Sequence, residues 1–405
     1  MTTLIQNISA LAGVHDPAAA LRGEELAVFP VINHAWVLVE DGIIAGVGTM
    51  DHGDVPGASV TIEARGSMIL PAWCDSHTHL VFAATREEEF VDKIRGMSYA
   101  EIAARGGGIL NSARKLNAMS EDELFNLAWK RLEDVQRMGT GAIEIKSGYG
   151  LTVEGELKML RVIRRLKERS SLIIRSTFLG AHTYPPEFKD DHEGYISMLE
   201  NEILPVIAGE KLADFIDVFC EEGFFSPAET ERICRAGMRY GLKPKIHANQ
   251  LNLSGGVQTG VKLGALSVDH LETMDDDAIR ALASSSTIGT LLPTAAFFLR
   301  MPFQPARAVI NAGAAVAIAS DFNPGSSPSG NMNLVVSMAC IGMKMLPEEA
   351  MNAATINGAF AMDVARETGS IALGKRAFLN ICPAVTSISY LPYSFGQQHV
   401  KPLNV

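Results

Sequence analysis

The chain has 405 residues, of which 47% are hydrophobic and 20% charged, and this composition is typical of a compact folded protein rather than a disordered chain. Its 35 basic and 46 acidic residues give a formal net charge of −11. This acidic balance, with no cluster of lysine and arginine interleaved with aromatic residues, argues against nucleic acid as a partner.

The cysteines and the apolar runs indicate the compartment. The cysteines are odd in number and widely spaced, and they include no CxxC pair, so they predict neither a disulfide framework nor a cysteine zinc site. The start of the chain lacks a secretory signal, and no apolar run approaches the roughly 20 residues of a membrane span. We therefore expect a cytoplasmic protein with no membrane partner.

Both ends of the chain predict short strands and turns. The stretch AWVLVEDGIIAGVG alternates apolar and polar residues around Asp41-Gly42, which is a hairpin signal. A similar pattern returns near the C-terminus in GSIALGKRAFLNICPAV. We predict that residues 1–66 and 360–405 together form one composite β-sandwich domain.

Between these ends, eight short apolar runs alternate with segments that are typical of amphipathic helices. The runs are SMILPAWCDSH, GAIEIKSG, LIIRSTFLGAH, FIDVFCEEG, PKIHANQ, LSVDHLE, IGTLLPT and AAVAIASD. Eight strands separated by helices favour a parallel sheet closed into a (β/α)₈ TIM-like barrel. We predict this barrel for residues 67–359, with an enlarged loop excursion over residues 80–140.

Polar residues at the ends of the runs are the candidates for chemistry, because the active site of such a barrel lies where strands end and βα loops begin. In chain order they are His77, His79, Tyr149, His182, Glu221, Glu222, His247, His270 and Asp321. Any one of them taken alone can be a structural residue. A single histidine is often simply hydrogen-bonded, and Asp321 could cap a turn.

Four of these residues together predict a metal site. Residues two apart in a strand point to the same side, so His77 and His79 can reach one ion. With His247 and Asp321 they offer three nitrogens and one oxygen, which suit zinc or another first-row metal. Such a metal would activate water and polarise a carbonyl, with Asp321 as the proton acceptor. His270 would stabilise the oxyanion or act only in orienting a neighbour.

This pattern, together with the split terminal β segments, resembles the amidohydrolase superfamily over essentially the whole chain. The intervening stretches are similar to those of the imidazolonepropionase family: DSHTHLVFAATREEEF, GMSYAEIAARGGGI, EIKSGYGL, FLGAHTYPPEF, HANQL and SDFNPGSSPS. The resemblance implies hydrolysis of 4-imidazolone-5-propanoate to N-formimidoyl-L-glutamate in histidine degradation. It also implies a homodimer with one divalent or trivalent metal per chain, either zinc or iron.

The resemblance assigns the same four metal ligands and adds contacts to a small substrate that carries a carboxylate. These contacts are Arg86, Tyr99, Tyr149, His182, Gln250, Asn323, Gly325 and Ser326. The guanidinium of Arg86 can form a bidentate contact with the propionate, although it could instead pair with the Glu87–Glu89 run. Asn323, Gly325 and Ser326 could hold a carboxylate, or they could serve only to bend a Pro-Gly turn.

One position departs from the resemblance. Gln250 stands where deaminase-like members of the superfamily and some imidazolonepropionases have a glutamate. An amide cannot shuttle a proton, so the proton transfers would fall to Asp321 and His270. This departure also argues against a purine or pyrimidine deaminase.

Two alternatives remain open at this point. One is another cyclic-amide hydrolase of the dihydroorotase or hydantoinase type, with two metals bridged by a carboxylated lysine. Lys146 falls on the second predicted strand and no lysine ends the fourth, so this bridge has no obvious donor. The other alternative is a barrel that has lost catalysis and acts as a scaffold, but every candidate ligand is present.

Overall fold

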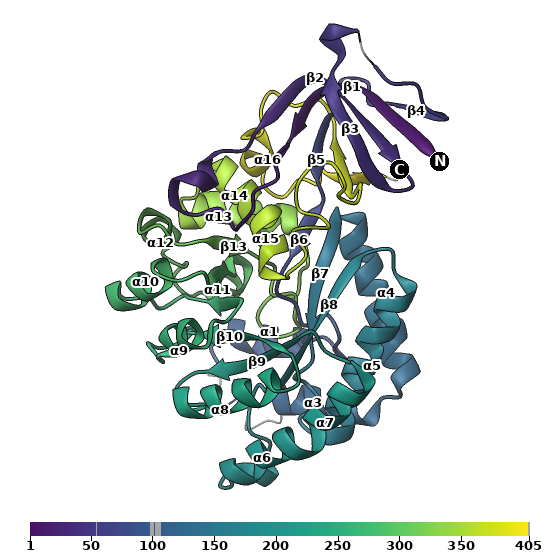
Figure 1. The fold of residues 1–405 in the computed structure, drawn as a ribbon. Helices are drawn as coiled ribbons and strands as arrows, with labels where there is room; N and C mark the ends of the chain where they lie inside the picture. The colour runs from purple at the N-terminus through teal and green to yellow at the C-terminus, as the bar shows by residue number, and fades with distance from the viewer. Residues whose placement is uncertain (54, 98–100, 102–106, 404–405) are drawn as a thin grey trace.

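The computed structural model describes residues 1–53, 55–97, 101 and 107–403. Two sheets organise the chain, an eight-stranded parallel sheet and a seven-stranded mixed sheet that lies at one end of it (Figure 1). Within the described part of the chain, we find no helix with the length and apolar character needed to cross a bilayer.

The parallel sheet forms the barrel, and its strands follow one another in sequence order from β6 to β13. They are β6 Trp73–Asp75, β7 Thr140–Lys146, β8 Ile173–Ala181, β9 Phe215–Cys220, β10 Lys243–Ala248, β11 Ser267–His270, β12 Ile288–Leu291 and β13 Val316–Ile318. Each predicted run contains one of these strands, so the predicted barrel fold class is confirmed.

The first and last strands are joined by hydrogen bonds around their carboxyl ends. The backbone N–H of Ser320 donates to Asp75 Oδ1 over 2.9 Å, and the Ser320 hydroxyl donates to Asp75 Oδ2 over 2.6 Å. One residue later, the N–H of Asp321 donates to the carbonyl oxygen of His77 over 3.0 Å. The contacts that close the barrel therefore also fix Asp321 beside His77.

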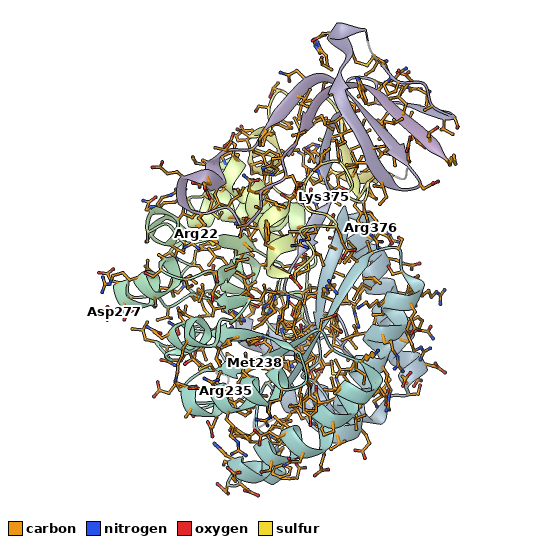
Figure 2. All side chains as sticks on the ribbon, in the orientation of Figure 1. Arg22, Arg235, Met238, Asp277, Lys375 and Arg376 are labelled. Atoms are coloured by element: carbon orange, nitrogen blue, oxygen red, sulfur yellow. The ribbon has the colours of Figure 1, made fainter. Side chains whose placement is uncertain are left out.

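Helices surround the strands, as the alternating pattern predicts. They are α1 Glu87–Ile94, α3 Gly108–Ala118, α4 Glu121–Arg137, α5 Val153–Arg169, α6 His192–Met198, α7 Leu204–Glu210, α8 Pro227–Met238, α9 Gly256–Leu263, α10 Asp276–Ala283, α11 Pro293–Leu299, α12 Ala306–Asn311, α13 Met332–Met343, α14 Pro347–Ala354, α15 Ile356–Ala361 and α16 Tyr390–Tyr393. Short 3-10 turns (η1 Gly23–Ala27, η2 Met50–His52, η3 Pro186–Phe188) and a π turn (η4 Leu199–Ile203) complete the list. Charged side chains such as Arg235 on α8 and Asp277 on α10 point to solvent (Figure 2).

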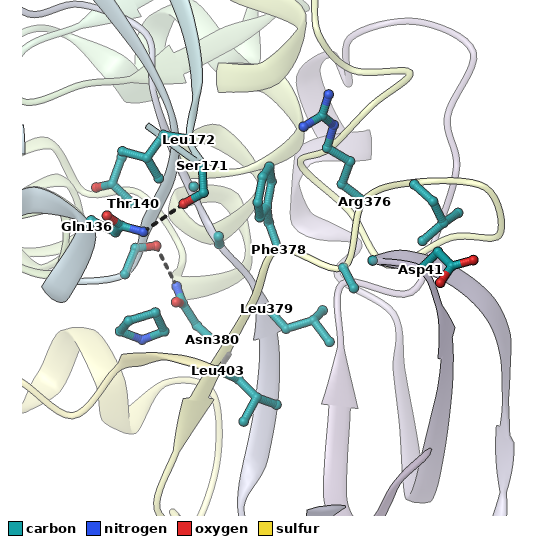
Figure 3. A pocket seen from close by; sticks show the side chains of 17 residues that line it. Asp41, Gln136, Thr140, Ser171, Leu172, Arg376, Phe378, Leu379, Asn380 and Leu403 are labelled. Carbon is teal, nitrogen blue, oxygen red and sulfur yellow. Dashed lines mark hydrogen bonds between the residues drawn. The ribbon is translucent and has the colours of Figure 1, made fainter. Parts of the chain in front are cut away.

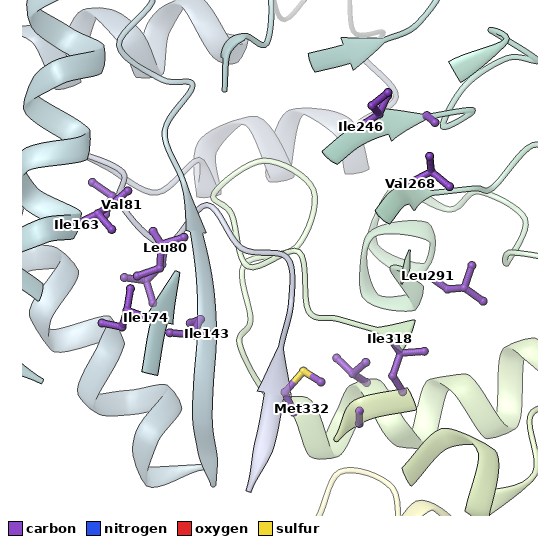
Figure 4. Packing of buried hydrophobic residues seen from close by; sticks show 14 of the residues in the cluster. Leu80, Val81, Ile143, Ile163, Ile174, Ile246, Val268, Leu291, Ile318 and Met332 are labelled. Carbon is purple, nitrogen blue, oxygen red and sulfur yellow. The ribbon is translucent and has the colours of Figure 1, made fainter. Parts of the chain in front are cut away.

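The main core fills the space between the strands and the helices. Ile143 of β7 and Ile174 of β8 pack toward Ile163 of α5, and Ile246 and Val268 occupy the matching place on β10 and β11 (Figure 4). Successive residues of a strand point to opposite faces, so the neighbours of these apolar residues face the barrel interior. Several of those neighbours are charged, which the apolar character of the runs did not predict.

The mixed sheet combines both ends of the chain, in the order β15-β14-β5-β1-β2-β3 with β4 paired to β1. Its strands are β1 Thr2–Ala12, β2 Val31–Glu40, β3 Ile43–Thr49, β4 Val60–Glu63, β5 Met68–Pro71, β14 Leu379–Cys382 and β15 Lys401–Leu403. Hydrogen bonds join all seven into a single sheet where a sandwich of two sheets was expected. This is possible because the long β1 pairs with β4 along its first half and with β5 along its second.

Two local predictions can be compared with this sheet. Asp41 and Gly42 form the turn between β2 and β3 with φ values of 48° and 78°, as the hairpin signal predicts. The first predicted barrel run is divided, because residues 68–71 pair with β1 and β14 as β5, and only residues 73–75 enter the barrel as β6.

A crevice with a volume of about 580 Å³ lies between the mixed sheet and the barrel (Figure 3). Gln136 donates to the Ser171 hydroxyl over 3.1 Å in its wall, and Asn380 donates to the carbonyl oxygen of Gly139 over 2.9 Å. Gly139 directly precedes β7, so the crevice opens at the amino ends of the barrel strands. The polar candidates of the sequence lie at the opposite ends.

The closing contact predicts a stability effect. Ser320→Ala leaves a buried Asp75 oxygen and the N–H of Phe322 without the Ser320 hydroxyl as a partner. We expect the free energy of unfolding to fall by about 1–3 kcal/mol in urea titrations. Ser284→Ala, at an exposed serine at the end of α10, should change it by less than about 0.5 kcal/mol. Equal effects of the two substitutions would contradict this role of Ser320.

Candidate metal centre and active site

Four histidines and one aspartate meet at the carboxyl ends of the barrel strands. His77 and His79 follow β6, His247 lies in β10, His270 ends β11 and Asp321 follows β13. Each is at most 3% exposed. Asp321 Oδ1 lies 3.5 Å from His77 Nε2 and 3.6 Å from His79 Nε2, and His79 Nε2 lies 3.4 Å from His247 Nε2. The structure thus brings together residues far apart in the sequence.

The donor atoms of this cluster fit a metal ion. Two of them, His77 Nε2 and Asp321 Oδ1, are buried and have no hydrogen-bond partner among the residues that the structure describes. Leaving such atoms unpaired costs free energy, and a cation between them would remove that cost. The potential ligand atoms of His77, His79 and His247 lie within 4.8 Å of one another, and so do those of His77, His270 and Asp321. Imidazole nitrogens and a carboxylate are suitable ligands for zinc and other first-row metals.

Burial disfavours protonation of two imidazoles of the cluster, and carboxylates hold two of them at Nδ1. Burial, with smaller effects of nearby cationic groups, lowers the pKa of His77 and of His79 well below the ordinary value. His77 Nδ1 lies 2.7 Å from Asp269 Oδ2, and His247 Nδ1 lies 2.9 Å from Asp217 Oδ2. The outward Nε2 atoms are therefore free to bind an ion. Sequence reasoning missed both aspartates, and the only signal was a charge inside the apolar runs FIDVFC and LSVDHLE.

His270 reaches the site through an unusual backbone conformation. Asp269 already faces the barrel interior, so regular alternation would turn His270 outward. A φ of 88° at His270, followed by 65° at Leu271, places the ring instead 5.6 Å from the His77 ring and 5.2 Å from the His247 ring, between ring centres. Its Nδ1 lies 3.3 Å from Glu272 Oε1. Burial opposes protonation of His270, but the combined effect of Glu272, Asp321 and Asp269 outweighs burial and raises the pKa.

Arg86 lies at the edge of this site, at the start of α1. Its Nε donates to the Ser112 hydroxyl over 2.9 Å, and its guanidinium lies 5.8 Å from the centre of the Tyr149 ring. A Cβ at Gly325 would stand 2.6 Å from Nη1, so a larger residue there would displace the guanidinium from this position. Among the described residues no carboxylate forms an ion pair with Arg86. The pairing with Glu87–Glu89 considered above is therefore not observed.

Tyr149 and His182 also line the site. The His182 ring stacks on that of His79, with 5.3 Å between ring centres and 18° between planes. Tyr149 is 4% exposed, and its ring lies 5.8 Å from that of His79. Burial and the neighbouring His247 lower the pKa of His182 to about 3. Its Nδ1 donates to the carbonyl oxygen of Gly148 over 3.0 Å, so Nε2 of the neutral ring can accept a hydrogen bond at the site.

The loop that carries Tyr149 is held by Glu156, which sequence reasoning did not identify. Glu156 is fully buried at the start of α5. Its carboxylate accepts three backbone N–H groups at 2.8–3.0 Å, those of Gly148, Gly150 and Leu151. In sequence it resembles any acidic residue in a first helical turn, where negative charge is common. Only the fold reveals that it turns inward.

The loop after β13 is shaped by Asn323. Its Oδ1 accepts the N–H groups of Gly325 and Ser326, both over 2.8 Å, and its Nδ2 donates to the carbonyl oxygen of Asp321. These N–H groups are therefore engaged within the loop in this conformation. The Ser326 hydroxyl donates to Asp321 Oδ2 over 3.2 Å, which leaves Oδ1 to face the histidines.

The remaining candidates are Gln250, Tyr99, Glu221 and Glu222. Gln250 is half-buried on the bend after β10, and Tyr99 lies outside the described residues. Glu221 is buried, but its carboxylate accepts the N–H groups of Leu251 and Asn252, so it holds the loop that carries Gln250. Glu222 is exposed to solvent.

Comparison with known proteins agrees with this geometry. Residues 224–400 match the model described as "Amidohydrolase family". An adenosine deaminase from Xanthomonas campestris with bound zinc has the same fold, with 17% identity, a TM-score of 0.67, and coverage of 99% of this chain and 92% of that one. Guanine deaminase from E. coli also matches, with 13% identity, a TM-score of 0.71 and coverage of 97% and 91%. Residues 224–400 thus match the amidohydrolase family, in a fold that the chain shares with these two deaminases.

Proteins of similar sequence identify the family of this chain more narrowly. An imidazolonepropionase from Flavobacterium johnsoniae is 54% identical over 402 residues, covering 99% of this chain and 98% of the relative. Imidazolonepropionases from Christiangramia forsetii and Geobacillus thermodenitrificans are 52% and 41% identical, with coverage of 100% and 99%, and of 95% and 92%, respectively. The chain therefore belongs to the imidazolonepropionase family, which confirms the resemblance inferred from its motifs.

The contacts of Glu156 predict that it orders the Tyr149 loop. Glu156→Ala removes the acceptor of three buried N–H groups, so their hydrogen exchange should become at least about tenfold faster, equivalent to about 1.4 kcal/mol. Exchange measured by mass spectrometry on peptides covering residues 147–152 would detect this. Glu154→Ala, at an exposed glutamate on the same helix, is the matched control. Unchanged protection in the Glu156 variant would exclude the role.

Proposed function

We propose that the protein hydrolyses 4-imidazolone-5-propanoate to N-formimidoyl-L-glutamate, breaking the cyclic amide C–N bond in histidine degradation. The observation that carries this proposal is the 54% identity to an imidazolonepropionase over 99% of the chain. The buried cluster of histidines and one aspartate at the carboxyl ends of the strands supplies the polar groups that this hydrolysis needs.

We assign one metal ion, zinc or iron, to His77, His79, His247 and Asp321. The unpartnered His77 Nε2 and Asp321 Oδ1 atoms support this assignment. When bound, such an ion lowers the pKa of a water molecule toward neutrality and polarises a carbonyl group. The donor set accepts both metals, so the choice between them is left to metal analysis.

The proton transfers are proposed for Asp321 and His270. The Asp321 carboxylate takes the proton of the water that attacks the ring carbonyl, and returns it to the ring nitrogen when the C–N bond breaks. His270, held by Glu272 at Nδ1, donates from Nε2 to the oxygen on which negative charge develops. Gln250, with its amide, holds the ring nitrogens and transfers no proton.

The substrate would lie between these groups and Arg86. We propose that the guanidinium binds the propionate, because it lies at the edge of the site without a carboxylate partner among the described residues. Tyr149 and His182 would hydrogen-bond the ring or the carboxylate. Asn323, Gly325 and Ser326 would line the amino-acid end of the product, and Tyr99 stays a sequence-based candidate.

One observation bears on the two-metal alternative. Lys146 Nζ is buried, 2.6 Å from Glu144 Oε1 and 2.9 Å from Asp217 Oδ2. A lysine held as an ammonium group by two carboxylates is a poor donor for a carboxylated bridge. This supports one metal per chain, and the intact ligand set argues against a non-catalytic scaffold. A cytoplasmic homodimer is proposed from the family resemblance alone.

Removal of the metal should abolish activity. We expect about one zinc or iron per chain by elemental analysis, and loss of turnover after chelation that returns when metal is added. Turnover is followed by the ultraviolet absorbance of freshly generated 4-imidazolone-5-propanoate. Asp321→Asn should lower kcat by at least about 100-fold, because the amide cannot accept a proton.

The exposed Asp277 provides the control, since Asp277→Asn should leave kcat unchanged. Bound metal without turnover in the unaltered protein would refute the substrate while keeping the class. About two metals per chain would favour the dihydroorotase or hydantoinase type.

Replacement of Arg86 should affect mainly binding. A charged hydrogen bond contributes about 1.5–3 kcal/mol, so Arg86→Ala should raise KM about 10- to 100-fold while kcat changes little. Arg95→Ala, at a largely exposed arginine at the other end of α1, should leave both constants unchanged. A normal KM in the Arg86 variant would rule out the carboxylate contact.

A further inference from the structure

Five charged side chains lie inside the barrel beneath the metal centre. Each is at most 1% exposed, and they come from four strands: Glu144 and Lys146 from β7, Asp217 from β9, Lys245 from β10 and Asp269 from β11. Burying so many charges is costly unless each has partners. Their arrangement therefore calls for a functional explanation.

The two lysines bind the three carboxylates together. Lys146 Nζ lies 2.6 Å from Glu144 Oε1, 2.9 Å from Asp217 Oδ2 and 3.7 Å from Asp269 Oδ2. Lys245 Nζ lies 2.9 Å from Glu144 Oε2 and 3.9 Å from Asp269 Oδ2. Lys146 is thus shared by two aspartates that lie on different strands.

The same aspartate oxygens contact the proposed metal ligands. Asp269 Oδ2 lies 2.7 Å from His77 Nδ1, and Asp217 Oδ2 lies 2.9 Å from His247 Nδ1. Asp217 Oδ1 also accepts the backbone N–H of His247 over 3.1 Å. A carboxylate is only an acceptor, so each of these contacts places the proton on Nδ1 and leaves the Nε2 lone pair to face the cluster.

The charges of this interior also favour a cation. Three carboxylates and two ammonium groups leave one net negative charge, and Asp321 adds a second one at the cluster. A bound cation would offset this negative charge. In a low-dielectric interior this balance stabilises a bound cation more than it would in water.

We infer that Asp217 and Asp269 are positioning residues for the metal centre, and that Lys146 couples them. This inference rests on the metal site of the proposed function. Each aspartate fixes the tautomer and orientation of one ligand imidazole, and the lysines keep both carboxylates in place. A change at Lys146 therefore reaches His77 and His247 at the same time.

The test measures zinc affinity and does not depend on turnover. Metal-free full-length protein is titrated with zinc against a coloured chelator. Asp217→Asn and Asp269→Asn should each weaken zinc binding about 10- to 100-fold. The visible spectrum of the cobalt-loaded variants should differ from that of the unaltered protein, because the coordination of the ion changes. Lys146→Met should weaken zinc binding as well.

A matched control separates this role from general destabilisation. Glu349 on α14 is a buried carboxylate paired with Arg307 of α12, and neither residue belongs to the cluster. Glu349→Gln should lower the melting temperature and leave zinc affinity unchanged. Folded Asp217 and Asp269 variants that bind zinc as tightly as the unaltered protein would overturn the inference.

A second measurement needs no substitution. In zinc-loaded protein labelled with ¹⁵N-histidine, the imidazole resonances of His77 and His247 should show Nδ1 protonated and Nε2 bound to metal. Protonation of Nε2 in either residue would overturn the inference even if the variants failed to fold. Failure of the unaltered protein to bind zinc or iron would instead refute the metal site of the proposed function.

Discussion

The hydrogen bond from the N–H of Asp321 to the carbonyl oxygen of His77 joins the last strand of the barrel to the first. The position of Asp321 depends on this contact, because a barrel that did not close here would separate the carboxylate from the imidazoles of His77 and His79. The Asp75–Ser320 pair reinforces it one residue earlier, at a depth where water is excluded. Folding and assembly of the site are thus one event, in which the contact that completes the sheet also completes the donor set.

The depth of each group follows from the two-residue repeat of the strands. His247 and Lys245 are two apart on β10 and both face the interior, with the imidazole at the carboxyl end and the ammonium group beneath it. Glu144 and Lys146 repeat this spacing on β7. The interior therefore consists of a charged layer below a histidine layer. The ion pairs of the lower layer hold the aspartates that contact the imidazoles of the upper layer.

Much of this arrangement can be predicted from the sequence, because strand ends are marked by local patterns. The HxH pair, His247, His270 and Asp321 all follow apolar runs, and a barrel brings such positions together. The roles of Asp217, Asp269 and Glu156 could not be predicted in this way, because each depends on a partner at least five residues away in the chain. A charge inside an apolar run is a visible signal, but the sequence does not say which imidazole it contacts. The division of the first run between two sheets is likewise a tertiary effect, since every residue of β5 and of β6 is buried and burial alone does not separate them.

The sequence places His270 in the site correctly, but the strand pattern alone does not explain how its side chain reaches the barrel axis. A regular strand end would direct Asp269 and His270 to opposite faces, and only one of them could reach the barrel axis. Both do so because His270 and Leu271 adopt positive φ values, a conformation that costs residues other than glycine of order 1–3 kcal/mol each. This strained backbone places the Asp269 carboxylate behind His77 and the His270 imidazole beside it, although the two residues are adjacent in the chain. Since Gln250 can only hydrogen-bond, this strained pair supplies the second proton-carrying group that the proposed hydrolysis needs alongside Asp321.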